Sequence, residues 1–233
     1  YQSMNQRLDV HLGRVVIQYG FYNELRDISL SRPSIFAPYS VYYERIRRSI
    51  SGHDGVSFKY QHLFGFDTLE WEGGIANPRS ARNDVRGMFP ENNFDGSANG
   101  QEAYFSRFVF EQPLKSRYAL YYTFLRWDFD GNFNTLSPFT FTPISIPISG
   151  SASLKSYGIS AQRTYNFVTI ATELFRHNIH YDGLIAGNDL KLNINSAYIQ
   201  AQIGCGPLQC LLQHEWFMPA DNDLLPLDTT LDT

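Results

Sequence analysis

Apolar and polar side chains alternate with a period of two over most of this sequence. Between residues 56 and 64, polar side chains at Ser57, Lys59 and Gln61 interrupt an otherwise aromatic and aliphatic run. Because successive side chains of a β-strand point to opposite faces, this period predicts strands with one apolar and one polar face. The pattern recurs often enough to predict about nine strands, near residues 8–12, 56–64, 68–75, 102–111, 118–124, 153–162, 167–177, 193–203 and 208–216.

The segments between these strands alternate in length. Short links fall near residues 65–67, 112–116, 163–166 and 204–207, and long polar links near residues 20–54, 77–101, 129–152 and 178–192. Short turns at one end and long loops at the other are typical of transmembrane β-barrels, where they lie on the periplasmic and extracellular sides respectively. Several of the strands also approach the ~9–11 residues that a tilted membrane strand needs.

The composition agrees with strands that have one wet face and one lipid face. Charged residues make up 18% of the chain, below the ~25% of soluble domains, and aromatic residues make up 15%. The mean hydropathy is only −0.30, and no run of about 18 apolar residues predicts a transmembrane helix. Aromatic side chains on the apolar faces are expected to form interfacial girdles, namely Trp71, Tyr104, Tyr118, Tyr122, Tyr157 and Trp216.

The predicted fold is therefore an all-β, antiparallel, up-and-down transmembrane β-barrel formed by residues 1–233 as a single domain. Bacterial barrels use an even number of strands, so about nine strands predict an incomplete barrel that belongs to a larger one. The sequence also opens at Tyr1 without a signal peptide, and no aromatic strand closes its final segment. We expect missing strands for these reasons.

Four motifs follow one another within residues 13–48: Gly13-Arg14, the stretch from Gly20 to Asp27 (GFYNELRD), the element from Arg32 to Ile35 (RPSI) and an aromatic-acidic turn at residues 39–45. In these motifs the chain resembles a family of Gram-negative, porin-like outer-membrane proteins, related in pattern to the phosphate-selective porins. It implies passive diffusion of solutes across the bacterial outer membrane, often through homotrimers. A lysine-rich constriction would mark a phosphate-selective member, but residues 20–54 hold arginines and no lysine.

The loop at residues 20–54 is the candidate constriction. If it folds into the lumen, it places guanidinium groups beside carboxylates across a narrow gap, and its arginine excess favours anions. The alternative is an extracellular loop with ordinary surface ion pairs, each of which contributes little. Stiff Arg32-Pro33 and Ala37-Pro38 steps favour the first interpretation. The candidate constriction residues are Arg26, Asp27, Arg32, Glu44, Arg45, Arg47 and Arg48.

The polar faces of the strands supply a candidate pore wall, made of Lys59, Glu70, Glu72, Arg107, Glu111 and Glu173. In a barrel these side chains line water, whereas in a soluble protein they form the wet face of a sheet. Cys205 and Cys210 flank a short turn, and their spacing fits a hairpin disulfide in the oxidising periplasm.

The expected function is that of a porin in the bacterial outer membrane, in contact with the lipid bilayer and lipopolysaccharide, that passes small hydrophilic solutes or anions. A net charge of −4 argues against a nucleic-acid partner. His53-Asp54 and the pair His177 and His180 raise the alternative of an outer-membrane enzyme, but no catalytic motif accompanies them. We therefore expect no enzyme activity, cofactor or metal. A soluble carbohydrate-binding β-sandwich is the remaining alternative.

Overall fold

A computed structural model of the chain describes residues 2–3, 5–21, 38, 40–41, 52–78, 94–136, 142–185, 188–205 and 208–219. These residues form one antiparallel sheet whose ten strands lie in sequence order. The first strand has only two residues, so nine long strands carry the architecture, as the period of two predicted. The strands are β1 (Gln2–Ser3), β2 (Gln6–Val15), β3 (His53–Phe64), β4 (Asp67–Pro78), β5 (Phe94–Gln112), β6 (Ser116–Leu136), β7 (Pro143–Tyr165), β8 (Val168–Ile185), β9 (Asn188–Cys205) and β10 (Leu208–Pro219).

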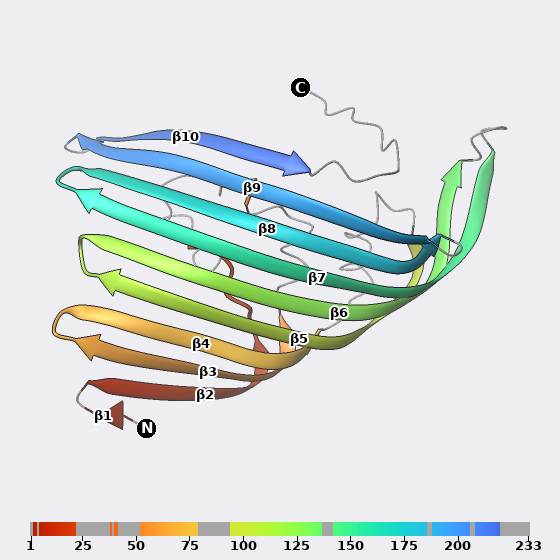
Figure 1. Cartoon of the computed structure of the whole chain (residues 1–233), viewed down its shortest axis with the longest axis horizontal. Helices are drawn as coiled ribbons and strands as arrows, with labels where there is room; N and C mark the ends of the chain where they lie inside the picture. Colours follow the sequence, from red (N-terminus) through yellow and green to blue (C-terminus); the bar gives the residue numbers. More distant parts are fainter. Residues whose placement is uncertain are drawn as a thin grey trace.

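The sheet is strongly curved, and the short turns gather at one end of it, the left in Figure 1. Each strand pairs with the strands before and after it in sequence, which confirms the predicted all-β, antiparallel, up-and-down topology. Within the described residues no pairing joins β10 to β1 or β2, so the sheet is not closed. No helix in the described part of the chain is long and apolar enough to cross a membrane.

In the half of the sheet near the short turns, the convex face is apolar and exposed. One row of directly paired residues crosses all nine long strands and consists only of aliphatic and aromatic side chains: Leu8, Tyr60, Trp71, Phe108, Leu120, Ile159, Leu174, Ala197 and Trp216. Leu120 is 54% exposed and Ile159 is 56% exposed. A soluble sheet buries its apolar face against another layer of structure. The described sheet instead leaves its apolar face exposed.

The turn end of the sheet is staggered with respect to this row. Strand β3 ends at Phe64, four residues beyond Tyr60, whereas β9 ends at Cys205, eight residues beyond Ala197. A progressive stagger of this kind appears when strands are tilted with respect to the edge of the sheet, as they are in a barrel.

The apolar side chains of the convex face follow the same stagger. On β4 they reach Ile75, four residues past Trp71, whereas on β9 they stop at Ala197 and give way to Asn195. The apolar band therefore runs parallel to the line of turns and not along the hydrogen-bonded rows. On β7 its convex positions run over the nine residues from Tyr157 to Tyr165 and are interrupted by Arg163.

Beyond the band, the polarity of the two faces reverses. On β6 the convex face changes from Phe124 to Arg126 and Asp128, while Trp127 and Phe129 are buried on the concave face. The alternation therefore continues with its faces exchanged, and β6 to β9 are longer than predicted. The expected long loops at residues 129–152 and 178–192 are wrong in extent, since β6 reaches Leu136, β7 begins at Pro143, and only two residues separate β8 from β9.

Candidate permeation surface

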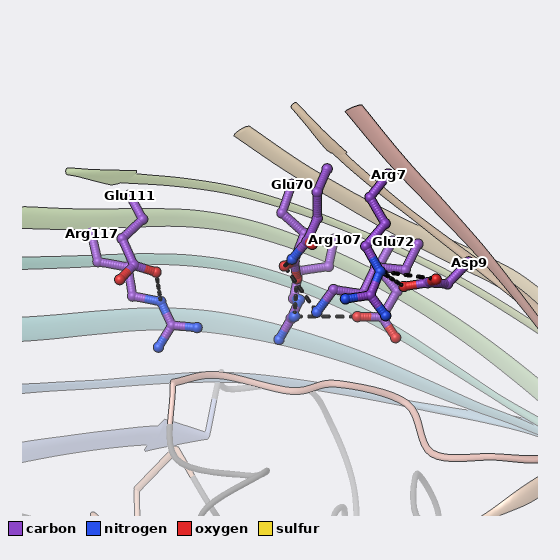
Figure 2. A network of polar contacts seen from close by, with 9 residues as sticks. Arg7, Asp9, Glu70, Glu72, Arg107, Glu111 and Arg117 are labelled. Carbon is purple, nitrogen blue, oxygen red and sulfur yellow. Dashed lines mark hydrogen bonds and ion pairs between the residues drawn. The ribbon is translucent and has the colours of Figure 1, made fainter. Parts of the chain in front are cut away.

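In the turn-side half of the sheet, most of the charged side chains lie on the concave face. Side chains from β2 to β6 point toward the same side in Figure 2, away from the apolar face. The described strands contribute four basic and six acidic residues to this face, namely Arg7, Lys59, Arg107 and Arg117, and Asp9, Glu70, Glu72, Glu111, Glu173 and Glu215. The described strands therefore give the concave face a formal net charge of −2.

A connected set of ion pairs spans β3, β4 and β5. The Nη2 atom of Arg107 lies 2.5 Å from Glu70 Oε1 and 3.2 Å from Glu72 Oε2. Glu70 also accepts from Lys59 Nζ at 2.9 Å and from the Gln61 side-chain amide at 2.8 Å. The Arg107 side chain is 3% exposed, and those of the two glutamates are 12% and 13% exposed. Two basic and two acidic side chains form this set, so each charge has an opposite partner, and only Lys59 of the four is substantially exposed.

Residues 16–21 leave the end of β2 and cross the concave face, and we call residues 16–21 with residues 40–41 the concave strap. Figure 1 shows residues 16–21 as a red trace behind the sheet. Ile17, Tyr19 and Phe21 of the strap are buried, as is Val41. The chain from β2 therefore reaches strands that are six to eight positions away in the sheet.

Glu173 of β8 is the main anchor of the strap. Its side chain is fully buried and accepts the Phe21 backbone N–H at 3.2 and 3.3 Å. It also accepts the hydroxyl of Ser160 at 2.7 Å and the hydroxyl of Tyr198 at 2.6 Å. Three donors from three elements satisfy the oxygens of one buried acidic side chain, as a buried polar group requires. The guanidinium of Arg117 lies 5.0 Å from the centre of the Phe21 ring.

A second group of contacts holds Tyr19. Its hydroxyl is hydrogen-bonded to His177 Nε2 at 2.8 Å, and His177 Nδ1 is hydrogen-bonded to Ser156 Oγ at 2.6 Å. The Tyr19 ring lies 4.4 Å from the ring of Phe175, centre to centre. Burial, with a smaller contribution from the Glu173 carboxylate, raises the pKa of the Tyr19 hydroxyl well above its ordinary value. The phenol therefore stays protonated and uncharged on the concave face.

The other described part of the 20–54 loop reaches still further across the sheet. The Ser40 backbone N–H donates to Glu215 Oε2 on β10 at 2.7 Å, and the Ser40 hydroxyl donates to the Ala197 carbonyl on β9 at 2.9 Å. The loop lies between β2 and β3 in the sequence, and these strands are at the other edge of the described sheet from β9 and β10. The loop thus covers the concave face at Phe21 and at Ser40.

All six predicted pore-wall residues lie on the concave face, although their environments differ. Lys59, Glu70, Glu72 and Arg107 form the ion-pair set, and Glu173 anchors the strap. Glu111 is half-exposed and lies 3.8 Å from Arg117. The predicted constriction residues Arg26, Asp27, Arg32, Glu44, Arg45, Arg47 and Arg48 lie outside the described residues.

The register of β9 and β10 pairs Cys205 with Leu208 and Cys210 with Ile203. The two cysteines are therefore diagonal neighbours and not directly opposite one another, and Cys210 is a free, exposed cysteine. Diagonal positions lie ~7–8 Å apart, which is at or beyond the usual Cα separation of a disulfide. The register does not favour the predicted disulfide.

The histidines that raised the enzyme alternative do not form one site. His177 is buried on the concave face, whereas His180 lies on the other face of β8, where it pairs with Asp189 at 3.1 Å. Among the described residues no group of three or more His, Cys, Asp or Glu side chains is arranged to hold a metal ion.

Sequence reasoning did not identify Tyr19, Ser40, Ser160 or Tyr198 as parts of the site. Tyr19 and Phe21 alternate with Gln18 and Gly20 immediately after a strand, and this pattern reads as a continued strand. Only the pairing of the strap with a distant carboxylate reveals its role. Comparisons with protein-family models, with curated proteins and with solved structures find no match for this chain.

Proposed function

We propose that the chain forms part of the wall of a bacterial outer-membrane β-barrel that acts as a porin for small hydrophilic solutes. The observation that carries this proposal is the band of exposed apolar side chains on the convex face, which follows the line of turns across nine strands. Tilted strands that cross a hydrocarbon layer need such a band, about nine to eleven residues deep. On β7 the convex positions from Tyr157 to Tyr165 span nine residues and are apolar apart from Arg163, which agrees with that depth.

The concave face supports a water-filled interior. Charged side chains occupy its turn-side half, and the strap takes up part of the space on this face, where Phe21 contacts Glu173. Such an arrangement sieves solutes by size and orients polar ones in a transverse field, with no bond broken and no cofactor. Anion preference rests on the loop arginines, because the described wall has two more acidic than basic residues.

A soluble β-sandwich accounts less well for the same residues. Its apolar face would pack on a second sheet, but the described strands form a single sheet whose apolar side is exposed. An open sheet edge in lipid leaves backbone groups unpaired, so the proposed barrel contains more strands than the nine long strands described. The trimer stays a prediction of the family resemblance.

Single-channel recording of the full-length protein in a planar bilayer under a KCl gradient tests the proposal. We expect steady ohmic steps, and the sign of the reversal potential gives the ion preference. Folded, heat-modifiable protein that inserts into the bilayer without conducting would exclude a porin.

A further inference from the structure

A groove on the convex face lies between β6 and β10, at the level of the apolar row. It has a volume of about 490 Å³ and is lined by Leu120, Tyr157, Ile159, Leu174, Arg176 and Met218, among others. The small residues Gly158 on β7 and Ala197 on β9 form the floor, which lies below the large side chains around it. The lining is apolar apart from one end, so the groove fits a hydrocarbon chain.

Basic side chains stand at the edge of the apolar band beside this groove. Arg176 on β8 and Lys155 on β7 are exposed and occupy diagonal positions, since Lys155 pairs with Asn178 and Arg176 pairs with Tyr157. Lys155 also lies above the Phe124 ring, with 5.9 Å between its Nζ and the ring centre. These cations lie where the band gives way to polar residues, on the side away from the short turns.

Arg126 on β6 extends this line by one more strand, diagonal to Lys155. It differs from the other two cations because its directly opposite residue on the neighbouring strand is the acidic Glu102. The Glu102 carboxylate also accepts the Tyr104 hydroxyl at 2.7 Å. We therefore assign the binding of an anion to Lys155 and Arg176, and Arg126 only adds to the local positive potential.

We propose that this face binds a phosphorylated lipid of the outer leaflet, with an acyl chain in the groove and a headgroup phosphate between Lys155 and Arg176. The inference rests on the proposed function, because it requires the convex face to meet lipid. Lipid phosphates lie at the boundary between hydrocarbon and water, and this is the level at which the two cations stand. Lipopolysaccharide, which carries acyl chains and phosphates in one molecule, has the required chemistry.

Binding of lipid A by the detergent-solubilised full-length protein tests the inference. The probes are bisphosphorylated lipid A and its dephosphorylated form, which share the same acyl chains. We expect the phosphorylated form to bind at least tenfold more tightly. The double variant Lys155→Gln/Arg176→Gln removes about a 25-fold contribution, since each basic residue near an anionic surface contributes about fivefold. Arg163→Gln, on the same face of β7 near the turns, is the matched control and leaves binding unchanged.

A variant that fills the groove distinguishes the contribution of the acyl chain to binding from that of the phosphate. Ala197→Phe is expected to weaken binding of both forms of lipid A, because it occupies the floor that both acyl chains share. Equal affinity for the two forms, or no effect of Lys155→Gln/Arg176→Gln, would overturn the inference. Full competition by inorganic phosphate would also overturn it, because a free anion would then suffice. Conductance of the same preparations reports on the porin independently, so a conducting protein without lipid selectivity refutes only this inference.

Discussion

The Phe21 backbone N–H donates to the buried Glu173 carboxylate, which joins the segment after β2 to β8, 152 residues further along the chain. This contact fixes the strap on the concave face at a point where Ser160 and Tyr198 donate to the same carboxylate. Leaving a buried donor without its acceptor costs about 1–3 kcal/mol, so the loss of Glu173 as an acceptor weakens the attachment of the strap.

Glu173→Gln is therefore expected to loosen the strap without unfolding the sheet. The glutamine amide keeps the volume but presents an N–H donor toward three other donors, so at least one contact is lost. We expect amide hydrogen exchange at Phe21 to accelerate at least tenfold and the single-channel conductance to rise.

Glu111→Gln is the control for this prediction. Glu111 lies on the same face but is half-exposed and 3.8 Å from its partner Arg117, so its replacement leaves the strap unchanged. Unchanged exchange at Phe21 in the Glu173→Gln variant would show that the carboxylate does not anchor the strap.

Arg107→Gln is expected to destabilise the protein and to shift its ion selectivity. Removing the buried guanidinium leaves Glu70 and Glu72 without their shared partner, which costs about 3 kcal/mol of unfolding free energy. The set of Lys59, Glu70, Glu72 and Arg107 changes from neutral to a charge of −1, so the reversal potential moves toward cations.

The double variant Arg107→Gln/Glu72→Gln restores neutrality to this set and should return the selectivity toward that of the intact protein. Urea unfolding in lipid vesicles measures the first effect, and bilayer recording measures the second. An Arg107→Gln protein with unchanged stability and reversal potential would mean that the ion-pair set neither holds the strands nor lines the pore.

Leu120→Lys is expected to oppose membrane insertion. Leu120 lies in the middle of the convex row, and a lysine on the lipid face near the bilayer centre costs about 2–4 kcal/mol. Asn132→Lys places the same charge on the same face of β6 beyond the apolar band, so it serves as the control. Folding into vesicles, followed by the heat-dependent shift in electrophoresis, should weaken only for Leu120→Lys. Equal folding of both variants would contradict a lipid-facing row.

Gly158→Ala is expected to destabilise the concave packing by about 1–3 kcal/mol. The Phe175 ring covers Gly158 so closely that an added Cβ would lie 2.1 Å from a ring carbon, and the displaced ring would in turn disturb Tyr19. Gly204→Ala is the control, because the nearest atom to an added Cβ there is 3.8 Å away. Urea unfolding compares the two, and a Gly158→Ala protein as stable as Gly204→Ala would show that the ring adapts without cost.

Much of this architecture could be predicted from the sequence, because a period of two identifies both the strands and their faces. The six pore-wall residues expected on the polar face, Lys59 and Glu173 among them, all lie on the concave side. The length of β6 could not be predicted in the same way, since beyond Phe124 the alternation passes from an apolar convex face to an apolar concave one. The mixture of aromatic and polar residues beyond Phe124 has no single apolar face, and the sequence therefore predicts a loop there.

The strap could not be predicted because its contacts are long-range. Nothing local in the segment from Ile17 to Phe21 indicates that it departs from the sheet, and its partner Glu173 looks like any inward carboxylate. The difference arises from tertiary contacts: a carboxylate that is fully buried needs several donors, and Phe21, Ser160 and Tyr198 supply them.

Nitroxide scanning of β7 decides whether the convex face of the sheet meets lipid. Spin labels placed one at a time at residues 155–163 of the full-length protein in lipid bilayers report collision with oxygen, which concentrates in hydrocarbon, and with a water-soluble nickel complex. We predict high oxygen and low nickel accessibility at Tyr157, Ile159 and Ala161, and the reverse at Lys155. Nickel accessibility at Ile159 as high as at Lys155 would contradict a lipid-facing convex surface and with it the membrane barrel.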